Sequence, residues 1–154
     1  MAPIPYRATF SVAEYAAIRR GLVPEEMEDK WFIFCEDEVL YLHRSWTGHC
    51  VYRVTFRSLH DAYEVREADV STDEQYYRRG KDDQEAHLLN FLIRTLLLNE
   101  GIQFPFPARL GRTGRGMYRY LFVGNVLTAA GLAEQEGFLI RTCRRLWRWL
   151  NDRS

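Results

Sequence analysis

Residues 31–56 read WFIFCEDEVLYLHRSWTGHCVYRVTF, and this stretch decides the fold. Aromatic and β-branched runs favour strands, and they occur at Trp31 to Phe34, Val39 to Arg44, Cys50 to Phe56 and Ala62 to Val70. Turn residues separate the first three runs, at Glu36 to Glu38 and at Ser45 to Gly48. Because short turns join antiparallel neighbours, the pattern predicts an antiparallel meander of about four strands. One face of such a sheet can pack on a core while the other meets water.

A first helix is expected ahead of this sheet. Ser11 and Glu14 form a capping box, and Gly21 lies where a glycine commonly ends a helix. One side of the helix would carry Val12, Tyr15, Ala16 and Ile18.

A second capping box follows the predicted sheet. It consists of Ser71 and Glu74, and it predicts a short helix over Asp73 to Arg79 that stops at Gly80. Asp82 or Asp83 would then cap a longer helix.

This longer helix is expected to run to about Asn99 and to end before Gly101. Its helical spacing gives a broad apolar face made of Leu88, Leu89, Leu92, Ile93, Leu96 and Leu97. That face would pack under the sheet. The fold class is therefore α+β, with an antiparallel meander against amphipathic helices.

The last third of the chain differs in charge from the rest. Residues 1–100 carry 12 Lys+Arg and 18 Asp+Glu, a net −6, whereas residues 101–154 carry 9 Arg and 3 acids, a net +6. The last third would form an Arg-rich loop over Gln103 to Gly116 and then C-terminal helices. The length of 154 residues fits one domain spanning 1–154.

Composition narrows the class of protein. The chain is 47% hydrophobic and 27% charged, which is typical of a globular domain and not of a disordered one. No apolar run approaches the roughly 18 residues of a membrane span, and the first residues do not resemble a signal peptide. The three cysteines, Cys35, Cys50 and Cys143, show no CxxC spacing. We expect free thiols in a cytoplasmic protein without a membrane partner.

The densest group of chemically useful side chains lies at the second turn. His43, Arg44, Ser45 and Trp46 combine a hydrogen-bonding ring, a planar cation, a hydroxyl and an indole. Such a group could stack on a base and bind a phosphate, so these residues are candidate ligand-binding residues. The alternative is a structural hairpin turn with a core tryptophan and a buried arginine stem.

The same residues resemble the motif of a small bacterial family. Its pattern D-K-W-F-I, L-Y-x-H-R-S-W-T-G and I-Y is similar to residues 29–33, 40–48 and Tyr52 of this chain. The resemblance covers residues 29–52. Members occur beside macrodomain-type ADP-ribose hydrolases or fused to them, so the resemblance implies a link to ADP-ribose or NAD metabolism.

A second group is the glycine-rich loop Arg109-Leu-Gly-Arg112-Thr-Gly-Arg115-Gly116. Its glycines would let backbone amides approach an anion, and Arg112 and Arg115 would supply charge to a phosphate. The loop has neither a Walker A ending nor a dinucleotide-binding spacing, and a surface loop without a ligand is the alternative. The acidic first hundred residues argue against nucleic acid as a partner.

Metal binding and catalysis find less support. Asp83 and His87 are four apart, but Asp82, Asp83 and Glu85 also suit the first turn of a helix, so we predict no metal site. His49 and Cys50 are adjacent in a strand and would point to opposite faces. No catalytic residues are assigned and no cofactor is expected. The one acid–base pair to test is His43 with Glu64 or Glu67.

Three functions remain open from the sequence. The first is a module that binds a nucleotide-like small molecule related to ADP-ribose or NAD. The second is a protein-interaction or homodimer module that uses Trp147 and Trp149 of the C-terminal Trp/Arg helix. The third is a hydrolase acting on an ADP-ribosyl or related bond.

Overall fold

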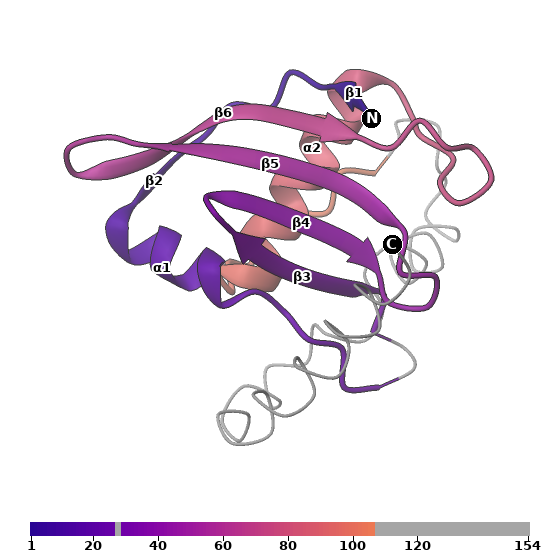
Figure 1. Ribbon diagram of the computed structural model, residues 1–154, viewed down its shortest axis with the longest axis horizontal. Coiled ribbons are helices and arrows are strands. Elements are labelled where there is room, and N and C mark those ends of the chain that lie inside the picture. The colour runs from indigo at the N-terminus through magenta and orange to yellow at the C-terminus, as the bar shows by residue number, and fades with distance from the viewer. Residues whose placement is uncertain (27–28, 107–154) are drawn as a thin grey trace.

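The sheet is an antiparallel meander, as the sequence predicts. The computed structural model describes residues 1–26 and 29–106. In chain order the meander consists of β3 (Trp31–Glu36), β4 (Val39–Arg44), β5 (Cys50–Ser58) and β6 (Ala62–Val70), each antiparallel to the next. The predicted bounds of β4 and β6 are confirmed, and β3 and β5 each extend two residues further. The fold is α+β (Figure 1).

Two short N-terminal strands complete the sheet, and the sequence did not reveal them. β1 (Ala2–Pro3) and β2 (Thr9–Ser11) both pair antiparallel with the outer edge of β6. The strand order is β1-β6-β5-β4-β3, with β2 also on β6. Strands of two or three residues carry no usable periodicity, so only the pairing with β6 defines them.

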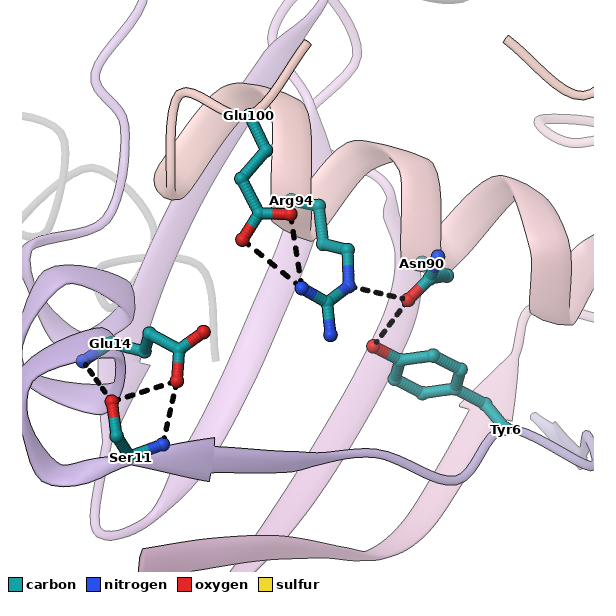
Figure 2. A network of polar contacts seen from close by, with 6 residues as sticks. All are labelled: Tyr6, Ser11, Glu14, Asn90, Arg94 and Glu100. Atoms are coloured by element: carbon teal, nitrogen blue, oxygen red, sulfur yellow. Dashed lines mark hydrogen bonds and ion pairs between the residues drawn. The ribbon is translucent and has the colours of Figure 1, made fainter. Parts of the chain in front are cut away.

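The first helix, α1 (Val12–Arg20), has the predicted ends. Its capping box joins Ser11 and Glu14 in both directions: the Ser11 amide donates to Glu14 Oε2 at 2.7 Å, and the Glu14 amide donates to Ser11 Oγ at 3.2 Å (Figure 2). Gly21 ends the helix with φ +68°. Of the four residues predicted on the buried side of α1, Tyr15 and Ile18 are buried, but Val12 and Ala16 are exposed.

The longer helix lies under the sheet, as predicted, but its ends differ. α2 (Asp82–Leu92) continues into one turn of π-helix, η1 (Ile93–Leu97). Its N-cap is Lys81 and not Asp82 or Asp83. It ends at Leu97, after which Asn99, with φ +55°, takes the left-handed conformation expected of a glycine. Asn99 was counted as helical because asparagine does not stop a helical pattern by itself.

The core lies between the sheet and α2. α2 lies behind the strands in Figure 1. Every residue of its predicted apolar face is buried except Leu96, which packs against the core from a partly buried position. From the sheet, Trp31, Ile33, Leu42, Tyr52 and Val54 are each at most 1% exposed and face the helix.

The predicted short helix over residues 73–79 is wrong. Only one turn forms there, at residues 74–76. Ser71 Oγ accepts from the Asp73 amide at 3.2 Å rather than from the Glu74 amide, so the capping box does not form. Tyr77 instead turns inward, where its hydroxyl donates to Glu85 of α2 at 2.8 Å. This tertiary contact outweighs the weak propensity of a short helix.

A polar network fastens the N-terminal segment to the helix behind the sheet (Figure 2). The Tyr6 hydroxyl donates to Asn90 Oδ1 at 3.4 Å, and Arg94 Nε donates to the same oxygen at 3.3 Å. Arg94 Nη1 also reaches both carboxylate oxygens of Glu100 at 3.0 Å. The network holds residues 1–11 against α2 and η1, which lets β1 and β2 cover the edge of β6.

Candidate functional site

Aromatic rings gather on the sheet face that is turned away from α2. Register pairs Phe32 with His43 and Phe34 with Tyr41, so all four side chains share this face. Phe34 stacks on Tyr41 with ring centroids 5.1 Å apart and on His43 at 5.4 Å, and Phe32 lies 5.4 Å from Phe34. We call these four residues the aromatic platform; each is partly buried.

The platform is not part of the core between the sheet and α2. α2 contributes its buried side chains to the other face of the sheet, and α1 packs there through Tyr15, whose ring lies 5.0 Å from that of Phe56. On a strand that alternates, the outward positions are normally polar. Four outward positions of β3 and β4 instead carry rings, at Phe32, Phe34, Tyr41 and His43.

An arginine adjoins the platform. Arg53 of β5 lies directly across from Tyr41, and Asp69 of β6 lies across from Arg53. Arg53 Nη2 and Nε donate to Asp69 Oδ2 at 2.7 and 3.1 Å, and this pairing raises the pKa of Arg53. The ion pair uses two of five guanidinium N–H donors, and the Arg53 side chain is 46% exposed.

His43 is the titratable member of the platform. Its Nδ1 lies 2.7 Å from the carbonyl oxygen of Gly48, and its Nε2 is buried with no hydrogen-bond partner. Burial lowers the pKa of His43, opposed by the hydrogen bond to Gly48 and assisted by nearby His49. The ring is therefore neutral at neutral pH.

The lowered pKa of His43 predicts a pH-dependent stability. The unfolded chain binds the proton more readily than the folded one, so the free energy of unfolding should fall as the pH drops from about 6.5 through the folded-state pKa. Urea unfolding at several pH values would measure this, and His43→Phe should remove that part of the fall. His60→Phe, in the exposed β5–β6 turn, is the control, and it should leave the fall in the free energy of unfolding unchanged. The same pH slope in the wild type and His43→Phe would contradict the assignment.

Arg44 lies on the opposite face from His43, in a cluster at the end of the core. Its guanidinium carbon is 4.4 Å above the Trp31 ring and 6.0 Å from the centre of the Tyr77 ring. Burial lowers the pKa of Arg44, and the neighbouring Tyr77, Tyr52 and Glu85 oppose that shift. Arg44 thus belongs to the inner face, with a packing role on Trp31.

Glu85 is the acceptor at the centre of this cluster. It is only 4% exposed and takes hydrogen bonds from the hydroxyls of Tyr52 and Tyr77 and from the Gly80 amide. The two hydroxyls also lie 2.9 Å apart. Sequence reasoning had placed Glu85 with the first-turn acids of the helix, because helical position does not reveal which tertiary donors surround a side chain.

The structure therefore separates the candidate residues of the second turn. Ser45 Oγ donates to the carbonyl of Asp29, which fixes the turn to the preceding loop. Trp46 is 66% exposed at the turn, with Lys30 Nζ 4.5 Å from its ring centre. Arg112 and Arg115 lie outside the described residues, as do Trp147 and Trp149. Of the four candidates that the structure describes, only His43 joins the platform.

The structure does not bring His43 close to Glu64 or to Glu67, the two acids that the sequence offers as its acid–base partner. In the sheet register, His43 of β4 lies opposite Cys50 of β5. Glu67 of β6 lies opposite Thr55 of β5, and Thr55 lies opposite Val39, at the other end of β4 from His43. Four residues along a strand correspond to about 13 Å. Glu64 lies still further along and forms an ion pair with Arg57.

The thiols and the potential metal ligands are accounted for within the described residues. Cys35 and Cys50 are free, and burial raises the pKa of Cys50 to about 11, which makes it a poor nucleophile. His87 Nδ1 donates to the carbonyl of Asp83 at 2.7 Å, so their spacing serves the helix. Residues 1–26 and 29–106 hold no group of three or more His, Cys, Asp or Glu arranged for a metal ion.

Sequence reasoning missed Phe32, Phe34, Tyr41 and Arg53. A signal for the first three was present: β3 and β4 carry aromatic residues at outward as well as inward positions, unlike a strand with one wet face. Arg53 had no such signal, because its place beside Tyr41 depends on the register between β4 and β5.

The comparisons with known proteins find no relative of this chain. No protein-family model, curated protein or solved structure matches the chain at a significant level. Separately, within the part of the chain that the structure describes, no helix is both long enough and apolar enough to cross a membrane.

Proposed function

We propose that this protein binds a nucleotide-like small molecule, related to ADP-ribose or NAD, on the aromatic platform. The observation that carries the proposal is the group of neighbouring rings on an outward sheet face, at Phe32, Phe34, Tyr41 and His43, in which Phe34 stacks on both Tyr41 and His43. A base would lie against these rings. Arg53, directly across from Tyr41, would contact the phosphates.

The physical chemistry of bases suits such a surface. Every nucleobase has an apolar π-face, and stacking it on an aromatic side chain contributes about 1–3 kcal/mol. Rings already stacked on one another lose little conformational entropy when a ligand arrives. Arginine offers a planar fork for phosphate oxygens. Together these features favour a planar base with an anionic tail.

The narrower identity of the ligand rests on the motif resemblance over residues 29–52, which implies a link to ADP-ribose or NAD metabolism. A cytoplasmic location belongs to the same proposal, because both ligands occur there and Cys35 and Cys50 are free thiols. The four platform residues lie within residues 29–52, whereas Trp31 and Arg44 of the same stretch lie on the inner face.

Ligand titration of a platform variant tests the proposal. We expect ADP-ribose, NAD or AMP to raise the melting temperature, because a ligand that binds the native state stabilises it. Phe34→Leu should weaken the affinity about tenfold or more, since it removes the ring that stacks on both Tyr41 and His43. Isothermal titration calorimetry on the full chain measures both.

Tyr63→Leu is the matched control. Tyr63 also stacks on another ring, that of Tyr15 at 3.7 Å, but it pairs with Ser58 at the far end of β5 and β6. Its loss should leave the affinity unchanged. No thermal shift with any of the three ligands at millimolar concentration would refute the proposal, and equal weakening by both variants would place the site elsewhere.

A further inference from the structure

The hydrogen bond between His43 and Gly48 fixes which ring nitrogen carries the proton. Nδ1 lies 2.7 Å from the Gly48 carbonyl oxygen, and a carbonyl can only accept. Nδ1 is therefore the donor in the neutral ring. The other nitrogen, Nε2, then carries a lone pair and can only accept.

Nε2 has nothing to accept from in the described protein. It is buried with no hydrogen-bond partner. The ring centroids of Phe34, Phe32 and Tyr41 lie 5.4, 6.3 and 6.4 Å from that of His43. The two phenylalanines have no polar hydrogen, and the Tyr41 hydroxyl does not bond to Nε2. A buried acceptor without a donor is an uncommon and unfavourable state, and in a native protein such a group calls for an explanation.

We propose that the ligand presents an N–H donor to His43 Nε2, so that the platform selects nucleobases carrying an exocyclic amino group, with adenine as the preferred base. This inference rests on the proposed function and deepens it. Adenine is favoured over cytosine because its two fused rings cover more of the platform. A carbonyl at the same position of the base would meet the Nε2 lone pair and be rejected.

Two features of the platform fit this assignment. Burial lowers the pKa of His43, so Nε2 does not take up a proton at neutral pH and remains an acceptor. The neighbouring rings of Phe32 and Phe34 are only partly buried. Rotation of an outward phenylalanine side chain admits the amino group without disturbing the inner core.

The test compares AMP with purine riboside 5′-monophosphate, which has the same rings and phosphate but lacks the amino group. For the wild-type chain we expect the dissociation constant of the second ligand to be about tenfold higher, as for one buried hydrogen bond. In His43→Phe, which keeps an aromatic ring at this position, the ratio should fall to about one. The coupling between variant and ligand isolates the single contact.

The outcomes separate this inference from the proposed function. Equal affinity of the wild type for both ligands would overturn the inference and leave the platform as a binding site. Binding of neither would overturn both. A ratio that persists in His43→Phe would place amino recognition at another residue and overturn the inference. Should that variant not fold, ¹⁵N NMR of His43 in the wild type decides: AMP must shift Nε2 and purine riboside monophosphate must not.

Discussion

Glu85→Ala is expected to lower the free energy of unfolding by about 3–5 kcal/mol, because it removes a buried charged acceptor. Glu85 is 4% exposed and accepts from the hydroxyls of Tyr52 and Tyr77 and from the Gly80 amide. The hydroxyls can still bond each other, but the Gly80 amide loses its acceptor and Arg44 loses a neighbouring negative charge.

Urea unfolding followed by circular dichroism measures this loss. Asp83→Ala is the control, since Asp83 lies in the same turn of α2 but is exposed, and it should cost at most about 1 kcal/mol. Glu85→Gln, which keeps one oxygen acceptor and the side-chain shape, should fall between the two. A loss below about 1 kcal/mol for Glu85→Ala would show that the cluster does not stabilise the fold.

Gly21→Ala is the second large effect, with an expected loss of about 2–4 kcal/mol. Gly21 has φ +68° and ψ −162°, a combination that is almost confined to glycine. An added Cβ would overlap the carbonyl oxygen of Ile33 and lie 3.1 Å from its carbonyl carbon. The next residue, Leu22, exchanges two hydrogen bonds of 2.8 Å with Ile33, so the strain would also disturb this pairing along β3.

Gly101→Ala is the matched control for this substitution. A Cβ at Gly101 would meet nothing within 4 Å, and its φ does not require glycine. Alanine there should leave stability unchanged or raise it by up to about 1 kcal/mol, because it restricts the unfolded chain. Thermal melts of both variants would check the pair. Similar melting temperatures for the two would mean that the junction of α1 and β3 tolerates a side chain.

These expectations assign different roles to the two faces of the sheet. The inner face carries Arg44, Tyr52 and the contacts to Glu85, whose loss should be seen as lost stability. The outer face carries the platform, where Phe34→Leu should be seen mainly as lost affinity. Measuring both properties for each variant distinguishes a residue that supports the fold from one that contacts a ligand.

Local patterns in the sequence determined much of the fold. The alternation in residues 31–70 gave the meander, with the bounds of β4 and β6 correct. The box of Ser11 with Glu14 and the glycine at 21 gave both ends of α1, because capping depends on residues within one or two turns. The apolar spacing from Leu88 to Leu97 gave the helix beneath the sheet.

Local sequence patterns predicted only part of the candidate site. His43 was found because it stands in a dense polar group, and alternation alone places His43 and Arg44 on opposite faces of a strand. Alternation does not show which face of the sheet packs against the helices. The pairing of Arg53 with Tyr41 also depends on a register that shifts between Leu42 and His43.

The sequence by itself therefore determined the strands, the capped helix and the class of fold, since these follow from interactions between residues close along the chain. Only the tertiary structure decided that residues 73–79 are not a helix, that Glu85 accepts from two tyrosines, and that Phe34 stacks on His43. Each of these depends on contacts between segments far apart in sequence, whose free energy exceeds local propensity.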